Sequence, residues 1–414
     1  MKKPELLSPA GDFERMEYAV AYGADAVYLA GKGFGMRTAS DNFDGAELEK
    51  AIRFCHEKGV RVFVTVNTMP REDEVCRLPA FLEELEQFGA DAAIIADLGV
   101  VKLCKKYAPH VEIHISTQAN IVNSEAAGIY YEMGAKRVVL ARELSLEEIM
   151  QIRAHTPKEL ELETFVHGAM CMSYSGRCYI SAHLTGRDAN RGACAQPCRW
   201  KYSLVEASRP DETFPVYEDE QGSYLLNSKD LCMIDHIPQL MEAGIDSFKI
   251  EGRVKTAYYT AAVTNAYRRA IDLYCRDPQH YDLTPWVRQE VDKVSHREYY
   301  TGFYFGDRDS QHPQDAGYLR TWDICAMYTG EETVQGAVFQ QKNKFAPGDM
   351  LELLTPQGPP RPIRLEAILD EEGHSMESAP HAHQRLILPG VFEVPPYSML
   401  RKKRENERAA EGLL

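Results

Sequence analysis

The chain of 414 residues is long enough for one large domain and a smaller one, and its 44% of apolar residues supports a full globular core. Its formal net charge of −15 disfavours a uniformly basic nucleic-acid binder, because contacts to phosphate require Lys and Arg. The amino-terminal residues show no apolar segment typical of a signal peptide, and no run of about 18 apolar residues occurs. We therefore expect a cytoplasmic protein without a membrane span, in which ten cysteines favour metal or redox chemistry over disulfides.

Short apolar runs alternate with amphipathic stretches as far as about residue 275. Each run is rich in Val, Ile or Leu and has the length of a buried parallel strand. Residues 44–58 illustrate the helical periodicity between runs, with Leu48, Ile52 and Cys55 on one face. An open doubly wound sheet is the alternative, but the residues after the first run lack its glycine-rich fingerprint. Eight such units predict an α/β fold, a (β/α)8 barrel of the TIM type in residues 1–276. The predicted strands are residues 5–8, 26–30, 62–66, 92–96, 112–116, 137–141, 161–166 and 247–250.

The seventh predicted strand is followed by a long insertion, assigned to residues 169–226, before the next expected helix at residues 228–243. Cys171, Cys178, Cys194 and Cys198 all lie in this insertion, among glycines and small polar residues. Loops that follow the strands of a barrel open onto its catalytic face. The cysteines are therefore expected to cover the mouth of the barrel.

The alternation stops after a helix predicted at residues 256–275. Residues 277–314 form a polar connection in which Tyr299, Tyr300, Phe303 and Tyr304 suit either stacking on nucleobases or packing between domains. Residues 315–402 change to a β pattern with turn signals and predict a small carboxy-terminal β-barrel, and residues 403–414 form a charged tail. The strands predicted in the second domain are residues 318–328, 333–340, 350–354, 363–368 and 385–388.

The four clustered cysteines indicate a soft metal centre, because thiolates suit zinc or iron–sulfur clusters. Structural zinc sites usually present cysteine pairs about two to four residues apart, whereas six residues separate Cys171 from Cys178. A four-iron cluster tolerates wider and irregular spacing. The preferred interpretation is an iron–sulfur cluster on Cys171, Cys178, Cys194 and Cys198, with zinc as the alternative. Cys232 is a fifth candidate, which leaves open whether it replaces Cys198.

The same stretch is locally basic within an acidic chain. Arg177, Arg187, Arg191, Arg199 and Lys201 are accompanied by a single acid, Asp188. A basic surface beside a metal centre suits an anionic small molecule or an RNA backbone, and arginine suits bidentate binding of carboxylates. A solvated, charged loop without a ligand is the plainer explanation.

Polar residues at the carboxyl ends of barrel strands are site candidates by position. A structural hydrogen bond is the alternative role for each of them. His114 falls within a strand and is expected in the core, whereas Glu251 is placed to orient Arg253. The candidates by position are Asn67, Asp97, Gln118, Asn120, Arg142, His167, Glu251 and Arg253, together with Arg37 in the loop after the second strand.

A family resemblance rests on three blocks of sequence. Residues 163–181 read ETFVHGAMCMSYSGRCYIS and resemble, without departure, the signature of the family historically called peptidase U32. The opening segment, residues 5–37, and the NSKDLC and FKIEGR blocks at residues 227–232 and 248–253 also resemble that family. The resemblance covers essentially the whole chain.

The family name implies proteolysis, but the sequence lacks the H-E-x-x-H and G-x-S-x-G motifs, and Cys171 with His167 would leave three neighbouring cysteines without a role. Better-understood members imply a different activity. They resemble oxygen-independent hydroxylases that hold a [4Fe–4S] cluster in a barrel, some of which form 5-hydroxyuridine at the wobble position of tRNA with prephenate as the hydroxyl donor. Others modify ribosomal RNA or ubiquinone precursors.

We therefore predict an iron–sulfur tRNA hydroxylase, with tRNA, prephenate and iron–sulfur assembly proteins as partners. A U32-type peptidase and a zinc-stapled RNA-binding module are the alternatives. The predicted catalytic residues are His167, Arg177, Glu251 and Arg253. The predicted substrate-binding residues are Arg37, Asn67, Gln118, Asn120, Arg142, Arg187 and Arg199.

Overall fold

The computed structural model describes residues 2–36, 42–171, 173–174, 176–200, 228–306, 318–356 and 358–404. It also describes the backbone of four short strands, β8 (Val205–Glu206), β9 (Arg209–Thr213), β10 (Glu218–Asp219) and β11 (Gly222–Ser223). Arg37, Lys201 and the side chain of Arg199 lie outside the described residues. No helix in the described part of the chain is long and apolar enough to cross a membrane.

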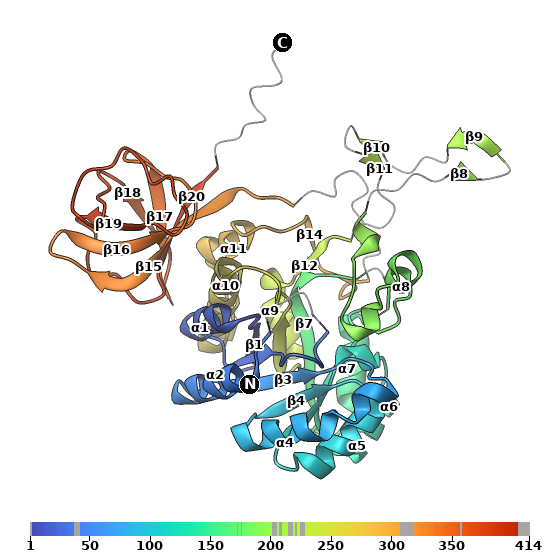
Figure 1. The fold of residues 1–414 in the computed structure, drawn as a ribbon. Helices are drawn as coiled ribbons and strands as arrows, with labels where there is room; N and C mark the ends of the chain where they lie inside the picture. Colours follow the sequence, from blue (N-terminus) through green and yellow to red (C-terminus); the bar gives the residue numbers. More distant parts are fainter. Residues whose placement is uncertain are drawn as a thin grey trace.

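Eight parallel strands close into a barrel, which confirms the predicted fold class (Figure 1). The last strand closes it by pairing with both the first and the seventh. The strands are β1 (Glu5–Pro9), β2 (Ala26–Leu29), β3 (Arg61–Val66), β4 (Ala92–Ile95), β5 (Glu112–Ile115), β6 (Ala135–Val139), β7 (Glu161–Ala169) and β13 (Ser247–Ile250).

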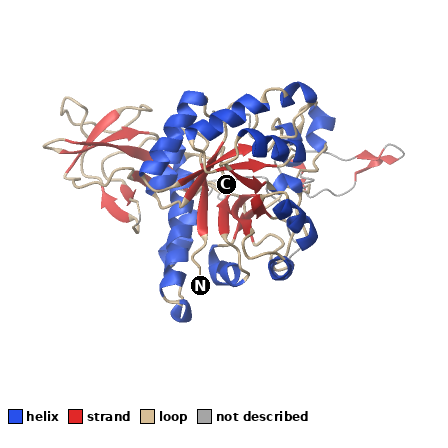
Figure 2. Ribbon diagram, turned by 90° about the horizontal axis from the view of Figure 1, so that it is seen from below, coloured by secondary structure: helices blue, strands red, loops and turns tan. Residues whose placement is uncertain are grey.

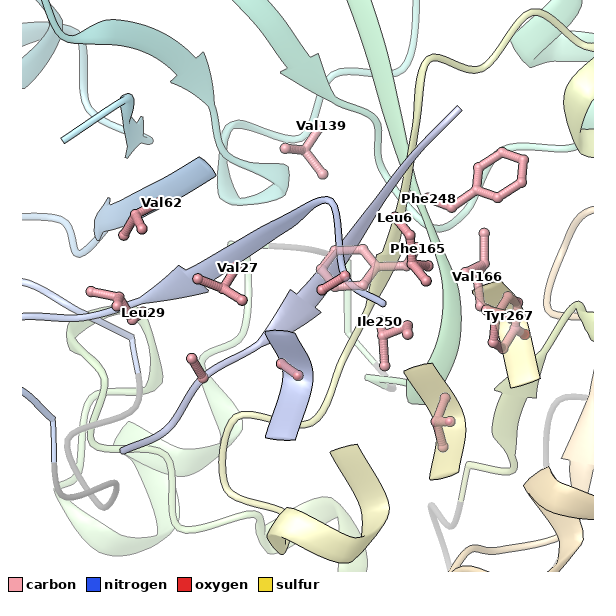
Figure 3. Close-up of a cluster of buried hydrophobic side chains, with 14 of the residues drawn as sticks. Leu6, Val27, Leu29, Val62, Val139, Phe165, Val166, Phe248, Ile250 and Tyr267 are labelled. Carbon is pink, nitrogen blue, oxygen red and sulfur yellow. Dashed lines mark hydrogen bonds between the residues drawn. The ribbon is translucent and has the colours of Figure 1, made fainter. Parts of the chain in front are cut away.

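Helices surround the barrel strands, as the view in Figure 2 shows. Their starts follow local sequence signals: Asp44 caps the predicted helix at residues 44–58 and forms a reciprocal capping box with Glu47. Side chains on the outer face of the wall, such as Leu6, Val27 and Phe248, are fully buried in one large hydrophobic cluster (Figure 3). The helices are α1 (Phe13–Ala21), α2 (Gly45–Glu57), α3 (Glu72–Val75), α4 (Leu78–Phe88), α5 (Leu98–Tyr107), α6 (Ser124–Glu132), α7 (Leu146–His155), α9 (Ile237–Glu242), α10 (Ala257–Arg276) and α11 (Pro285–Asp292).

The seventh unit differs from the prediction at its return to the barrel. Residues 228–243 were expected to form one helix, but β12 (Asp230–Cys232) comes first, then a 3-10 turn (Ile234–His236), and α9 begins at Ile237. β12 pairs antiparallel with the end of β7 and parallel with β14 (Tyr299–Tyr300). The prediction was wrong because the extended end of β7 offers a hydrogen-bonding partner that local helical propensity cannot reveal.

The carboxy-terminal part is a curved, half-barrel antiparallel sheet in the order β18-β17-β20-β15-β16-β19. It has its own core, which includes Phe339 and Phe345. The strand β20 lies in the middle of the sheet, although its sequence, MLRKK, was not predicted as a strand. The strands are β15 (Trp322–Glu332), β16 (Gly336–Gln341), β17 (Met350–Leu354), β18 (Arg361–Arg364), β19 (Arg385–Pro389) and β20 (Met399–Lys403).

A buried ion pair joins this sheet to the barrel. Arg401 of β20 and Glu290 of α11 are both fully buried, and Arg401 Nη1 donates to Glu290 Oε2 at 2.9 Å. Arg401 Nη2 also donates to Glu352 at 2.8 Å, and Glu352 accepts from Lys293. Charges at this depth persist because each one is paired and hydrogen-bonded. The strand β20 therefore contains Arg401 because it lies at the interface between the sheet and the barrel.

The interior of the barrel contains a second charged network. Arg137 of β6 is 1% exposed and donates to Glu5 of β1 at 2.6 Å and to Glu163 of β7 at 2.9 Å. Its Nη2 also donates to Glu161 at 2.6 Å. Burial raises the pKa of Glu5, but the Arg137 charge and hydrogen bond, with help from Arg61, outweigh this and lower it to about 2.

His114 lies beside this network and is fully buried, as predicted for a core histidine. Burial, and then the neighbouring Arg137 charge, hold its pKa well below the usual range, so its imidazole is neutral.

We expect the Arg137→Ala variant to lose about 3–5 kcal/mol of unfolding free energy, because Glu5, Glu161 and Glu163 would lose their shared cation inside the barrel. Urea denaturation followed by circular dichroism measures the loss. The matched control is Arg385→Ala, which removes an exposed arginine that also binds two glutamates, Glu331 and Glu371. A similar loss in both variants would contradict a central role for Arg137.

Candidate metal centre and active site

A small cavity of about 60 Å³ opens at the carboxyl ends of the barrel strands, and we call it the mouth cavity. Three cationic side chains, Arg142, Lys249 and Arg253, line it together with the carboxylate of Glu251. Five residues that were predicted from their positions at strand ends line this cavity: Asn67, Gln118, Arg142, Glu251 and Arg253. The other lining residues are Tyr28, Met36, Thr65, Ile94, Ser116, Thr117, Phe165 and Lys249.

Three mouth residues that were not predicted, Tyr28, Thr65 and Lys249, could have been recognised from the sequence by two features. Tyr28 and Thr65 face inward by strand alternation near the carboxyl ends of β2 and β3. Lys249 is the one charged residue of the buried strand β13. A lysine in a buried strand requires a partner or a ligand, and Lys249 Nζ donates to Glu163 Oε1 at 2.7 Å.

Arg142 is fixed at the mouth by three groups. Its guanidinium lies 3.9 Å from the centre of the Phe165 ring, and its Nη1 donates to the Ala169 carbonyl at 3.2 Å. Its Nη2 lies 4.0 Å from a carboxylate oxygen of Glu251. Within the described part of the structure, its buried Nε has no hydrogen-bond partner. Arg142 is thus oriented by the protein, and the Ala169 carbonyl takes only one of its five N–H donors.

The other predicted mouth residues are held by main-chain and side-chain hydrogen bonds. Arg253 is 3% exposed, and its Nη1 donates to Thr65 Oγ1 at 3.0 Å. Asn67 accepts from the backbone of Met36 and donates to Ser116, both at 3.3 Å. Asn67 therefore ties the loop after β2 to the mouth.

A second cavity, of about 90 Å³, lies directly beside the mouth cavity, and we call it the cysteine cavity. Cys171, Cys178, Cys194 and Cys198 all line it. Four further lining residues belong to both cavities: Met36, Thr117, Gln118 and Arg142. The four thiols predicted from the sequence are therefore brought together at the wall of the barrel mouth.

The geometry of the cysteine cavity suits a group larger than a single ion. A tetrahedral zinc site with Zn–S bonds of about 2.3 Å requires sulfur atoms about 4 Å apart. Among the described residues, no three cysteine sulfurs lie within 4.8 Å of one another. Cys194 Sγ accepts a hydrogen bond from the Gln196 backbone at 3.3 Å, which is the kind of contact that tunes a ligating thiolate.

Small polar residues give residues 170–200, the cysteine segment, a defined shape. Ser181, in the short helix α8 (Ile180–Thr185), donates to the Arg187 carbonyl at 2.7 Å and accepts from the Ala195 backbone at 3.0 Å. Asn190 donates to the Cys178 carbonyl at 3.1 Å. These hydrogen bonds connect the first and second cysteine pairs, so the glycines and small polar residues of the segment build the cavity.

Gly176 lets the cysteine segment touch the barrel. Its φ is +71°, and a Cβ atom at this position would lie 2.2 Å from the Gln118 carbonyl oxygen. Gln118 belongs to the 3-10 turn after β5 (Thr117–Ala119) and lines both cavities. Glycine is required because other residues rarely adopt this φ and because their side chain would collide with the turn.

His167 does not face the mouth. Phe165 pairs with Lys249 of β13, but the next pair is His167 with Ile250, so one extra residue of β7 forms a bulge. The bulge reverses the alternation and turns His167 toward Tyr267 of α10 and Tyr299, whose hydroxyls each lie 3.4 Å from a ring nitrogen. Burial, and then the nearby His296, hold the pKa of His167 well below its usual range.

Several other predicted residues lie away from both cavities. Asp97 caps α5, and its side chain accepts from the Val100 backbone at 3.1 Å. Arg177 and Arg187 are exposed on the cysteine segment, where Arg187 Nε donates to the Ala193 carbonyl at 3.0 Å. Asn120 lies next to the turn that lines the mouth cavity but does not line either cavity itself.

Cys232 is separated from the four clustered thiols. It is buried in β12, opposite His167 of β7, and does not line the cysteine cavity. Burial raises the pKa of its thiol to about 12. Cys198, and not Cys232, therefore shares the cysteine cavity with the other three thiols.

Comparison with known proteins gives a consistent result. A family model described as peptidase family U32 matches residues 11–314, and one described as peptidase family U32 C-terminal domain matches residues 320–401. The tRNA hydroxylation protein P1 of Bacillus subtilis (strain 168) is 37% identical over 404 residues, which cover 97% of this chain and 95% of that protein.

Two further relatives carry different names. The tRNA hydroxylation protein P of Escherichia coli (strain K12) is 36% identical over 437 aligned residues, which cover 94% of each chain. A protein of Porphyromonas gingivalis named collagenase is 33% identical over 314 residues, covering 73% of this chain and 74% of its own length.

We expect Gly176→Ala to loosen the cysteine segment, because the new methyl group would collide with the Gln118 carbonyl. Limited proteolysis with mass spectrometry should show faster cleavage within residues 170–200. The matched control is Gly186→Ala, because Gly186 has a φ of +69° but no heavy atom within 4 Å of the added Cβ. Equal cleavage of the two variants would show that backbone strain, rather than the contact with Gln118, controls the segment.

Proposed function

We propose that this chain, which belongs to peptidase family U32, is an iron–sulfur enzyme that hydroxylates a uridine of tRNA without molecular oxygen. The observation that carries the proposal is the shared wall between the cysteine cavity and the mouth cavity. Relatives named tRNA hydroxylation proteins, which align over almost the entire chain, support tRNA as the substrate. We further propose 5-hydroxyuridine at the wobble position as the product and prephenate as the hydroxyl donor.

The donor set in the cysteine cavity fits a [4Fe–4S] cluster. Cys171, Cys178, Cys194 and Cys198 would hold it, since all four line one cavity and their sulfurs are spaced too widely for a single zinc ion. When bound, such a cluster supplies electron transfer at the edge of the mouth. The side chains of Arg142 and Gln118 would lie between it and the substrates.

The cations of the mouth suit a dicarboxylate such as prephenate. Arg142 and Arg253 are held in fixed orientations by their protein contacts, and a fixed guanidinium binds carboxylates with little loss of entropy. Replacing the C5–H bond of uridine with C5–OH is a two-electron oxidation. The exchange balances if the donor's C–OH becomes C–H, so that the donor takes up the two electrons and the proton.

The surface of the cysteine segment suits single-stranded RNA. Tyr174, Tyr179 and Trp200 are 58%, 72% and 43% exposed, which is unusual for large aromatic side chains on one short segment. Arg177 and Arg187 are exposed on the same segment. RNA loops are recognised by bases stacking on aromatic rings and by cations along the backbone, and a target base must leave its stack to enter a cavity.

The arrangement of the cysteines and His167 supports peptide hydrolysis less than it supports RNA hydroxylation. A cysteine nucleophile requires a base within hydrogen-bonding distance. No histidine lines the cysteine cavity among the described residues, and both ring nitrogens of His167 lie next to tyrosine hydroxyls in the barrel wall.

We expect anaerobically purified protein to contain iron and sulfide, and Cys198→Ala to lose most of both. Cys232→Ala should retain them, because Cys232 lies outside the cysteine cavity. Metal analysis and visible absorbance measure the difference. Stoichiometric zinc in place of iron, or loss of iron in Cys232→Ala alone, would contradict the assignment.

We also expect tRNA from a strain lacking this protein to gain one oxygen on uridine when incubated anaerobically with purified protein and prephenate. Arg142→Ala should lower the yield about 10- to 100-fold at unchanged iron content, and Arg142→Lys should restore it only in part, because lysine keeps the charge but not the guanidinium fork. Nucleoside mass spectrometry provides the measurement. Peptide cleavage that disappears in Cys171→Ala, without any oxygen gain, would favour the peptidase alternative.

A further inference from the structure

A cleft of about 450 Å³ lies between the barrel and the carboxy-terminal sheet. One wall comes from the β13–α10 connection and the start of α10, including Lys255 and Tyr259. The opposite wall comes from Tyr318, Arg320 and Trp322, at and before the start of β15. Figure 1 shows β15 next to α10 and α11.

We propose that this interdomain cleft binds the RNA strand next to the target nucleotide, with one flanking base against the Tyr318 ring and the adjoining phosphate near Lys255. This inference rests on the proposed function and extends it to the carboxy-terminal domain. It assigns a binding role to residues such as Tyr318 and Lys255, which line neither the mouth cavity nor the cysteine cavity.

Tyr318 is suited to stack on a base. Its side chain is 42% exposed, so part of the ring remains open to a ligand. Its neighbour Leu319 pairs with His296 through two backbone hydrogen bonds, of 2.7 and 3.2 Å, which fix the main chain beside Tyr318. An exposed ring on a fixed backbone stacks on a base at a small cost in entropy.

Cations surround this ring. Lys255 Nζ lies 4.3 Å from the centre of the Tyr318 ring, and the Arg297 guanidinium lies 4.7 Å from it. Nearby, Arg320 and Arg404 share one carboxylate, that of Asp323, at 2.8 and 2.7 Å. Arg297 also lies 3.6 Å from Asp230, and Glu251 lines the cleft, so carboxylates balance most of these cations. Lys255 forms no ion pair with a carboxylate of the described residues, which leaves it beside the Tyr318 ring as the cation that suits a phosphate.

The cleft is continuous with the site already described. Glu251 lines both the cleft and the mouth cavity, and Gln196 of the cysteine segment also lines the cleft. We place a base in the mouth and a base on Tyr318 on one strand because Glu251 belongs to the walls of both sites. The volume is within the range of about 300–1,000 Å³ that is usual for ligand sites, and the path from mouth to sheet favours a polymer over an isolated small molecule.

The buried tyrosines of the connecting segment do not compete for this role. Tyr300 and Tyr304 are 9% and 6% exposed, and the Tyr304 hydroxyl donates to the Phe165 carbonyl at 2.6 Å. They pack inside the molecule, so neither can take the place of Tyr318, which is 42% exposed and lines the cleft.

The test measures binding of a synthetic anticodon stem–loop RNA with uridine at the wobble position, by fluorescence anisotropy on the iron-loaded protein. Tyr318→Ala should weaken binding about 5- to 100-fold, and Tyr318→Phe should restore it, because the ring is kept. The matched control is Phe392→Ala, which removes an aromatic ring that is 47% exposed on the same domain but does not line the cleft. Lys255→Ala should lower the slope of log affinity against log salt by about 1.

Unchanged RNA affinity in Tyr318→Ala, or equal weakening in Phe392→Ala, would overturn the inference. The hydroxylation assay separates this failure from a failure of the proposed function. If wild-type protein hydroxylates tRNA and Tyr318→Ala does so equally well, the cleft is not an RNA site and the enzyme assignment stands. If wild-type protein does not hydroxylate tRNA but binds the stem–loop through Tyr318, the cleft assignment stands and the enzyme assignment falls.

Discussion

The close approach of β7 and β13 at Gly168 determines where the site can form. Gly168 has a φ of +108°, and a Cβ atom there would lie 2.4 Å from the Glu251 carbonyl oxygen. The Glu251 backbone N–H donates to the His167 carbonyl at 2.8 Å, so the two strands stay joined beyond the bulge in β7. This contact sets Glu251 at the mouth and directs the chain toward Cys171, which follows three residues later. A larger residue at position 168 would separate the carboxylate from the first cysteine.

Charge is distributed very differently at the two ends of the barrel. Near the amino-terminal ends of the strands, Arg137 is balanced by three glutamates. One of them, Glu163, also accepts from Lys249, which lines the mouth cavity. At the mouth, Arg142, Lys249 and Arg253 line the cavity with a single carboxylate, that of Glu251, among the described lining residues. Because buried cations require compensation, the anionic ligand proposed for the mouth would complete the charge balance at this end of the barrel. The chain's overall negative charge conceals this local excess.

The sequence was sufficient to predict the barrel strands and the proximity of the four cysteines, and the reasons are physical. Parallel strands buried on both faces must be continuous apolar runs, so they are recognisable from local composition. The four cysteines share one short segment, so their proximity in space needed little tertiary information. Asn67, Gln118 and Arg142 were found because strand ends converge at one edge of a barrel.

Long-range contacts account for what the sequence could not predict. The strand β12 exists because β7 extends past the barrel and offers it a partner. The strand β20 was not predicted because its sequence is charged and the partner of Arg401, Glu290, lies 111 residues away in the chain. His167 was expected at the site because it follows the seventh strand, but a single-residue bulge in β7 turns it away from the mouth. Each of these depends on a pairing between distant segments that no local pattern records.

The carboxy-terminal sheet is part of the site's architecture as well as a separate core. Arg401 binds Glu290 of α11. Tyr22, the residue after α1, donates its hydroxyl proton to the Tyr397 carbonyl at 3.0 Å. The sheet is therefore held to the barrel at two places. Met327, Leu354 and Met399 of the sheet belong to the barrel's hydrophobic cluster. A domain joined to the barrel by a flexible linker alone would not require these buried contacts. They provide the rigid attachment that a cleft wall needs when residues on both sides must meet one ligand within hydrogen-bonding and stacking distance.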